Sequence, residues 1–117
     1  MGSVSRPPRR RAKEDLRIKE VRDALDENPA LDAGDLARKV NLSRSRLDEL
    51  FKRYASVGLG DFIRQQRLVL AAKLLESTDS RAKEIAHLVG YEHASSFTRA
   101  FKQFFGISPS EYRRRRS

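Results

Sequence analysis

The chain has 117 residues, with 25 Lys and Arg against 16 Asp and Glu, and its formal net charge is therefore +9. This length supports one compact domain or two very small ones, and it excludes barrels and doubly wound enzymes. The absence of cysteine excludes a disulfide framework, a thiolate zinc site and a thiol nucleophile. A strong excess of basic residues indicates a polyanionic partner. No apolar run approaches the roughly 18 residues of a membrane span, so we expect no contact with a membrane.

The positive charge is concentrated at the two ends of the chain. Residues 1–13 contain five Lys and Arg, residues 113–116 are four arginines, and neither segment contains an acid. Residues 14–112 contain sixteen bases and sixteen acids and are formally neutral. Residues 1–13 also contain two prolines and lack apolar periodicity, which predicts a disordered basic arm or linker.

The first half of the chain predicts short helices separated by tight turns. Apolar residues with helical spacing indicate a helix over 15–27, which ends before Pro29. Asp32 followed by Asp35 resembles a capping box, and it predicts the start of a second helix that runs through Val40.

A third helix should follow a turn at Asn41, a residue type that accepts a positive φ. Ser43 or Ser45 is expected to cap this helix, and its buried face should hold Leu47, Leu50 and Phe51. Good helix formers and regularly spaced apolar residues then predict a long central helix over 61–76.

The last part of the chain predicts three more helices. One covers 81–89 and ends at Gly90, and the next covers 94–105 and ends at Gly106. The final helix should be capped by the serine, proline and carboxylate of Ser108, Pro109 and Glu111.

Two segments of the chain repeat each other. Residues 36–54 match residues 85–104, with an offset of 49 before the turn and 50 after it. In each copy a short helix, a tight turn and a second helix with an apolar inner face follow one another, which is typical of a helix-turn-helix. Packed helix pairs without a ligand would show the same pattern, but solenoids usually need three or more repeats.

The repeat and the helix pattern together predict an all-α fold of about seven helices. In it, two helix-turn-helix subdomains are joined by a long central helix. The expected divisions are an arm at 1–13, a first subdomain at 14–58, a linker helix at 59–77 and a second subdomain with a basic C-terminal tail at 78–117.

Residues 16–115 resemble the DNA-binding domain of the AraC/XylS family of bacterial transcription regulators. The most specific segment is IAHLVGYEHASSFTRAFKQFFGISPSEYR at 85–113. The resemblance implies a homeodomain-like, sequence-specific DNA-binding domain that places two recognition helices in adjacent major grooves on one face of DNA. It also implies a transcription regulator that is more often an activator and that contacts RNA polymerase.

The resemblance places the recognition positions on one helix of each repeat, at Ser45, Asp48, Glu49 and Lys52 and at Ser95, Ser96, Arg99 and Gln103, and all of these except Lys52 are candidates for base reading. Helical geometry agrees, because it turns these positions outward when Leu47, Leu50, Phe51, Phe97, Phe101 and Phe104 point inward. Arg99 is the best candidate, since a guanidinium can bond guanine O6 and N7 together, although a phosphate contact is the alternative.

The first recognition helix departs from a basic pattern at Asp48 and Glu49. A carboxylate near phosphates is repelled unless it accepts a hydrogen bond from cytosine N4 or pairs with a nearby base. Either the first repeat reads a half-site that contains cytosine, which we favour, or it docks weakly and the second repeat dominates.

Five basic side chains are candidates for phosphate contacts, with a solvated face as the alternative for each: Arg38, Arg44, Arg46, Lys52 and Lys102. Two histidines cannot build a metal site alone, and the chain contains no phosphate-binding loop or nucleophile elbow. We therefore expect no enzyme activity, no metal and no cofactor.

The expected partners are double-stranded DNA and RNA polymerase, in a cytoplasmic, nucleoid-associated protein. Residues 4–13 resemble the end of a linker, so we expect an effector or dimerisation domain to precede this segment in a longer protein. The alternative is a protein-interaction module that keeps the fold and binds DNA only non-specifically through its basic ends.

Overall fold

A computed structural model describes residues 9–116, and all regular structure within that range is helical. The seven helices are α1 (Arg9–Glu27), α2 (Ala33–Lys39), α3 (Arg44–Tyr54), α4 (Leu59–Ser77), α5 (Ala82–Leu88), α6 (Ala94–Phe105) and α7 (Pro109–Arg116). The predicted all-α fold of about seven helices is confirmed, and the predicted linker helix at 59–77 coincides with α4.

The helices form two units, each with its own apolar core. The first unit consists of α1, α2, α3 and the first half of α4, which contributes Leu59, Phe62 and Ile63 to the core. The second unit consists of the second half of α4 with α5, α6 and α7, and here α4 contributes Leu68, Ala71, Ala72 and Leu75. The central helix therefore contributes residues to both cores and also connects the two units.

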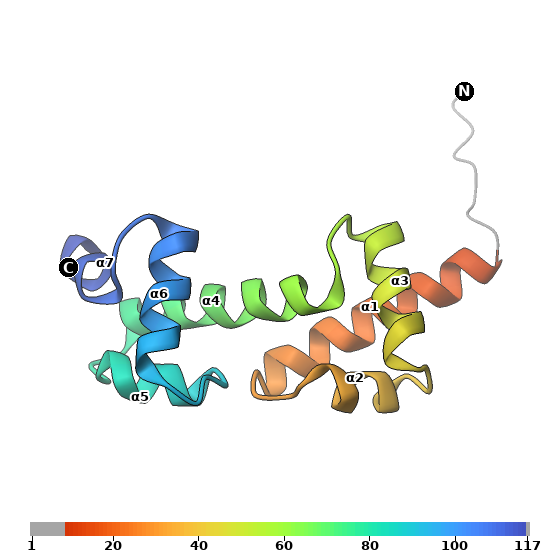
Figure 1. Ribbon diagram of the computed structural model, residues 1–117, viewed down its shortest axis with the longest axis horizontal. Helices are drawn as coiled ribbons and strands as arrows, with labels where there is room; N and C mark the ends of the chain where they lie inside the picture. Colours follow the sequence, from red (N-terminus) through yellow and green to blue (C-terminus); the bar gives the residue numbers. More distant parts are fainter. Residues whose placement is uncertain (1–8, 117) are drawn as a thin grey trace, which may run out of the picture.

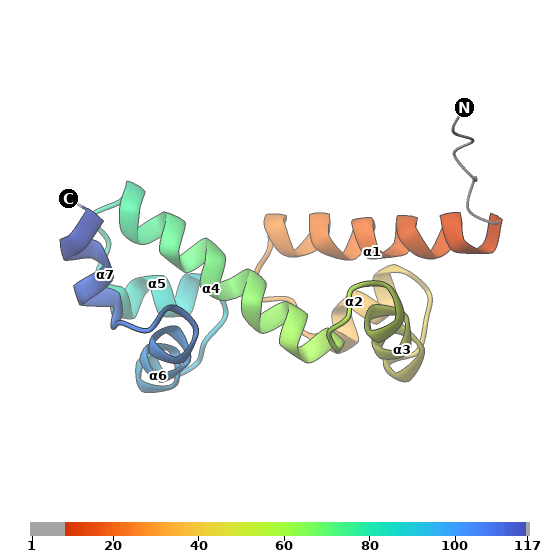
Figure 2. The ribbon, with the colours of Figure 1, turned by 90° about the horizontal axis from the view of Figure 1, so that it is seen from above.

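The two units lie side by side along α4, with α3 and α6 projecting in similar directions (Figure 1). Seen from above, α3 and α6 are viewed nearly end-on and both lie toward the lower edge of the view, while α1 lies at the upper edge, on the opposite side of the first unit (Figure 2). The longest dimension of the molecule is 48 Å.

Capping and turn residues fix where the helices of the first unit begin. Asp32 caps α2, and the reciprocal hydrogen bonds between Asp32 and Asp35 complete the predicted capping box, at 2.9 and 3.1 Å. Ser43, rather than Ser45, caps α3 by accepting a hydrogen bond from the amide of Arg46. Asn41 has a φ of 57°, as its turn position predicts.

The structure differs from the sequence prediction at the N-terminal end of the chain. Residues 9–13 were expected in a disordered arm, but α1 begins at Arg9, because arginine, alanine and lysine have high helix propensity and no helix breaker follows Pro8. Residues 1–8 of the predicted arm lie outside the described residues. The expected C-terminal tail, residues 113–116, forms the last turns of α7.

One predicted core residue is also wrong. Phe104 is 46% exposed, whereas Phe97 and Phe101 are fully buried. Phe105 takes the inner place, since its ring packs at a tilt against Phe101 and Tyr112, with centroid distances of 4.5 and 5.4 Å. The reason is geometric, because a residue four positions after Phe101 continues the buried stripe on the side that α7 covers.

Candidate nucleic-acid interface

The outward faces of α3 and α6 carry the predicted base-reading residues. In α6 the side chains of Ser95, Ser96, Arg99 and Gln103 are all exposed, opposite the buried rings of Phe97 and Phe101. In α3, Ser45, Glu49 and Lys52 are exposed, opposite Leu47 and Phe51. The structure thus brings both predicted sets to exposed faces of two helices that lie toward the same edge of the molecule (Figure 2), while their contacts with bases stay predictions.

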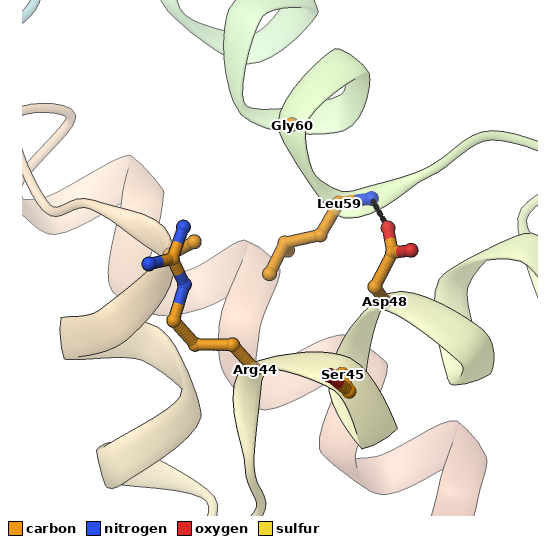
Figure 3. Close-up of a pocket in the computed structure, with 6 residues that line it drawn as sticks. Arg44, Ser45, Asp48, Leu59 and Gly60 are labelled. Carbon is orange, nitrogen blue, oxygen red and sulfur yellow. Dashed lines mark hydrogen bonds between the residues drawn. The ribbon is translucent and has the colours of Figure 1, made fainter.

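Asp48 differs from the other residues of this set because its carboxylate has two partners within the protein. Its Oδ1 accepts a hydrogen bond from the backbone amide of Leu59, the first residue of α4, at 2.9 Å (Figure 3). Its Oδ2 pairs with Lys52 Nζ at 3.0 Å. The amide hydrogen bond, followed by the one from Lys52, lowers the pKa of Asp48 below its ordinary value. Asp48 therefore caps the central helix from the recognition helix.

A comparison of the two units indicates why α4 is capped by a side chain from α3. The N-cap of α4 is Gly58, which has no side chain to accept a hydrogen bond. In the second unit the position equivalent to Leu59 is Pro109, which has no N–H, and the position equivalent to Asp48 is Thr98. There the N-cap Ser108 accepts from the amide of Glu111 at 3.2 Å, and no distant carboxylate is required.

Gly58 also leaves space for the Asp48 carboxylate. A Cβ at position 58 would lie 3.0 Å from Asp48 Oδ1, closer than ordinary van der Waals contact. The acid in α3 and the glycine before α4 therefore belong to one arrangement. This arrangement gives a structural reason for a carboxylate on a helix face that is expected to be basic in a DNA-binding protein.

An open groove of about 470 Å³ lies beside this cap (Figure 3). Its lining combines the first residues of three helices, Ala33 of α2, Arg44 and Ser45 of α3, and Leu59 and Gly60 of α4, with Asp48. The side chain of Arg44 and the first-turn amides of α3 contribute positive charge to this groove, and the carboxylate of Asp48 offsets part of it.

The two recognition helices differ in charge. Helix α6 has the bases Arg99 and Lys102 and no acid, whereas α3 has four bases and two acids. The predicted phosphate residues Arg38, Arg44, Arg46, Lys52 and Lys102 are all exposed. Two of them form exposed ion pairs, Arg38 with Asp35 and Lys52 with Asp48. Such pairs contribute little to stability and can be exchanged for phosphate contacts.

Two arginines with structural contacts carry no sequence motif that predicts those contacts. On α4, Arg67 donates to the carbonyls of Pro29 and Leu31, and on α7, Arg113 donates to those of Leu75 and Thr78. For Arg67 the available signal is weak and consists of apolar residues one turn away on either side, Ile63 and Ala71; α7 is mainly polar and offers no such signal for Arg113. Arg113 belongs to the basic segment 113–116, but it is half-buried and its hydrogen bonds hold α7 against the end of α4.

Within the described residues, His, Asp and Glu nowhere gather in a group that could hold a metal ion. The same part of the chain has no helix long and apolar enough to cross a bilayer.

Comparison with known proteins relates this arrangement to bacterial regulators. A family model described as a helix-turn-helix domain matches residues 36–115, which is more than half of the chain. The chain is 39% identical over 80 residues to the regulatory protein SoxS of Escherichia coli, covering 68% of this chain and 75% of SoxS. It is 36% identical over 85 residues to the Msm operon regulatory protein of Streptococcus mutans, covering 73% of this chain and 31% of that protein.

Solved structures give the same relationship. A transcriptional regulator of Chromobacterium violaceum with an AraC-type DNA-binding domain superposes with a TM-score of 0.81 at 27% identity, over 91% of this chain and 96% of that one. The DNA-binding domain of the global transcriptional factor AdpA, solved in complex with a target DNA, superposes with a TM-score of 0.73 at 25% identity, over 86% and 89% of the two chains.

Proposed function

The chain belongs to the AraC/XylS family of helix-turn-helix DNA-binding domains, and we propose that it recognises specific DNA sequences for a bacterial transcription regulator. The observation that carries this proposal is the pair of exposed recognition faces on α3 and α6, which one continuous helix holds on the same side of the molecule (Figure 2). The known proteins that resemble it are named as regulators, and one is a DNA-binding domain in complex with its target.

In the proposed mode of binding, α3 and α6 enter adjacent major grooves on one face of DNA. Successive major grooves on one face are about 34 Å apart. The molecule is 48 Å long, and α4 has 19 residues, so it spans roughly 28 Å. These dimensions accommodate two recognition helices one DNA turn apart when the widths of the flanking helices are included.

The two units have different proposed roles in reading the sequence. In α6, Arg99 reads guanine while Ser95, Ser96 and Gln103 contact base edges or phosphates. In α3, Ser45 and Glu49 contact the bases, and the Glu49 carboxylate accepts a hydrogen bond from a cytosine N4. Because the Asp48 carboxylate already accepts a hydrogen bond from the amide of Leu59, we assign Asp48 primarily a structural role and not base reading.

The wider setting is also a proposal. The chain spans 31% of the length of the Msm operon regulatory protein, so the activity of a whole protein does not follow from it. We propose that it works as a binding domain without catalysis, in the cytoplasm at the nucleoid. In a longer activator it would act together with an effector or dimerisation domain and with RNA polymerase.

Selection of bound sequences from random double-stranded DNA tests the proposal. We expect enriched sites with two short conserved blocks about one helical turn apart, because each recognition helix reads one block. The competing function is a protein-interaction module that binds DNA only through its basic ends. Such a module would enrich no sequence, and its complexes would dissociate as salt rises, since only phosphate contacts hold them.

A further inference from the structure

Arg67 lies on α4 at the boundary between the two cores. The first core includes α4 up to Ile63, and the second begins at Leu68. The guanidinium of Arg67 reaches back to the first unit, where Nε donates to the carbonyl of Pro29 at 2.8 Å and Nη2 donates to that of Leu31 at 3.1 Å. Both carbonyls belong to the turn between α1 and α2, so Arg67 fastens this turn to the central helix.

The second unit packs against the same arginine through its helix-turn-helix turn. A Cβ at Gly90 would lie 2.9 Å from Arg67 Nε and 3.0 Å from the Cα of Ala30, so the two units approach each other here at backbone distance. The equivalent turn of the first unit contains Asn41, which also has a positive φ but carries a side chain. A glycine in the second turn is thus explained by this close approach as well as by its φ of 102°.

The contact continues into the recognition helix. Tyr91 follows Gly90 and packs edge-on against the buried Phe97 of α6, with ring centroids 5.5 Å apart. On the other side, Leu31 packs against the first core and Asp32 caps α2, which contacts α3. A displacement at the junction would therefore change the position of one recognition helix relative to the other.

We propose that Arg67, seated between Gly90 and the carbonyls of Pro29 and Leu31, is a positioning residue that fixes the two helix-turn-helix units relative to each other. Helix α4 alone would permit bending where the cores meet, because side-chain packing from a single unit does not span that boundary. The junction adds two directed hydrogen bonds and a close backbone contact. Its consequence for DNA, a strict spacing between half-sites, rests on the proposed function.

Distance measurements between spin labels test the proposal without DNA. Because the chain has no cysteine, Arg46→Cys and Ser96→Cys place labels at equivalent exposed positions of α3 and α6 alone. We expect a narrow distance distribution that Arg67→Lys broadens, since lysine keeps the charge but loses the paired donors. The matched control is Arg113→Lys, which removes two similar bonds inside the second unit and should leave the width unchanged.

A second variant keeps the proposal testable if Arg67→Lys fails to fold. Gly90→Asn leaves the arginine in place and supplies a residue type that accepts positive φ, but its Cβ presses on Ala30, so the mean distance should increase. An unchanged distribution in Arg67→Lys, or in Gly90→Asn where the lysine variant does not fold, would overturn the proposal.

Binding to selected DNA gives the functional arm. Arg67→Lys should weaken binding to the two-half-site DNA roughly tenfold while binding to an isolated half-site stays unchanged, because only the linkage between the sites is lost. Equal losses on both DNAs would contradict a positioning role. Failure of the wild-type chain to select any DNA would overturn the proposed function and would leave the label distances as the test of the junction.

Discussion

At the scale of single residues, an exposed position on a recognition helix does not by itself indicate a contact with DNA. Asp48 and Glu49 are adjacent acids on α3, and the sequence alone gives no reason to assign them different roles. The structure separates them, because Asp48 accepts from the first amide of α4 and from Lys52, while Glu49 is simply exposed. The two acids should therefore respond differently to substitution.

Replacing Asp48 should affect stability more than sequence preference. Asp48→Ala removes the cap of α4, and we expect the Tm to fall by about 5 °C. Asp48→Asn should lose less, since its amide oxygen can still accept. Thermal unfolding followed by circular dichroism measures both, with Glu49→Ala as the control that leaves the Tm unchanged. An unchanged Tm together with an altered preference at one base pair would contradict the capping role.

Glu49 tests whether the first unit reads cytosine. Glu49→Ala should relax the preference for a C·G pair at one position of the first half-site, because the acceptor for cytosine N4 is lost. Binding to a panel of half-site variants measures the preference at each position. If the preference is the same at every position, the cytosine hypothesis is wrong, and the second unit supplies most of the specificity.

Arg99 should determine one position of the second half-site. Arg99→Ala should lower discrimination at a single base pair by about 1–3 kcal/mol, because a bidentate contact with guanine is lost. In contrast, Lys102→Ala should weaken binding to all sequences alike, as expected for a phosphate contact. Competition with single-base variants distinguishes the two, and uniform weakening by Arg99→Ala would assign that arginine to phosphate.

At the scale of elements, the two units show how one repeat is adjusted to two surroundings. The first unit pairs a capping aspartate with Gly58, whereas the second uses Ser108 followed by Pro109. The turns differ in the same way, with Asn41 where there is space and Gly90 where Ala30 is close. Differences between the copies are therefore as informative as their similarity.

Helix capping by carboxylates makes stability depend on acid pH. Amide hydrogen bonds, chiefly from Asp35 for Asp32 and from Leu59 for Asp48, lower the pKa values of both groups. A lowered pKa in the folded state means that the contribution is complete above the unfolded value of 3.8 and is lost as pH falls below it. We therefore expect the Tm to decline below about pH 4.

The double variant Asp32→Asn with Asp48→Asn tests this dependence. Asparagine keeps an acceptor at each cap but does not titrate, so the Tm should decline less steeply between about pH 4 and pH 2 than in the wild type. Calorimetry over that range measures the slope. Parallel curves for the two proteins would show that other carboxylates control the acid transition.

At the scale of the whole molecule, the net charge of +9 has a narrower meaning than it first suggests. Its excess lies at the two ends of the chain, yet residues 9–13 are helical and Arg113 is used to brace α4. Arg114 and Arg115 are exposed and pair with Glu111, so they remain able to exchange that carboxylate for phosphate. We expect these basic ends to raise affinity without contributing sequence preference.

The salt dependence of binding tests the role of the C-terminal arginines. Replacing Arg114 and Arg115 by glutamine should reduce the slope of log K against log salt by up to about 1.8, because two phosphate contacts are lost. The selected consensus should stay the same. The control is Lys19→Gln, which should not change the slope. Lys19 is exposed on α1, and this helix lies on the opposite side of the first unit from α3 (Figure 2). An altered consensus would contradict a purely electrostatic role.

The sequence by itself determined the helices, except for the first residues of α1, and it also determined the turns and the division into two similar units. These features depend on local information such as caps, glycines and 3.6-residue periodicity, which explains why α6 and the Asp32 capping box are confirmed residue by residue. The repeat likewise identified which face of α3 and of α6 is exposed. Phe104 was the exception, because its environment depends on where α7 packs.

Only the tertiary structure decided how exposed polar residues are used. The backbone amide that Asp48 binds is eleven positions away, the carbonyls that Arg67 binds are 38 and 36 positions away, and Gly90 meets Ala30 across the two units. Such contacts join groups that are distant along the chain and whose residue types are common on any helix surface. Periodicity reports which side of a helix is buried, but it contains no information about which backbone group will lie opposite a particular side chain.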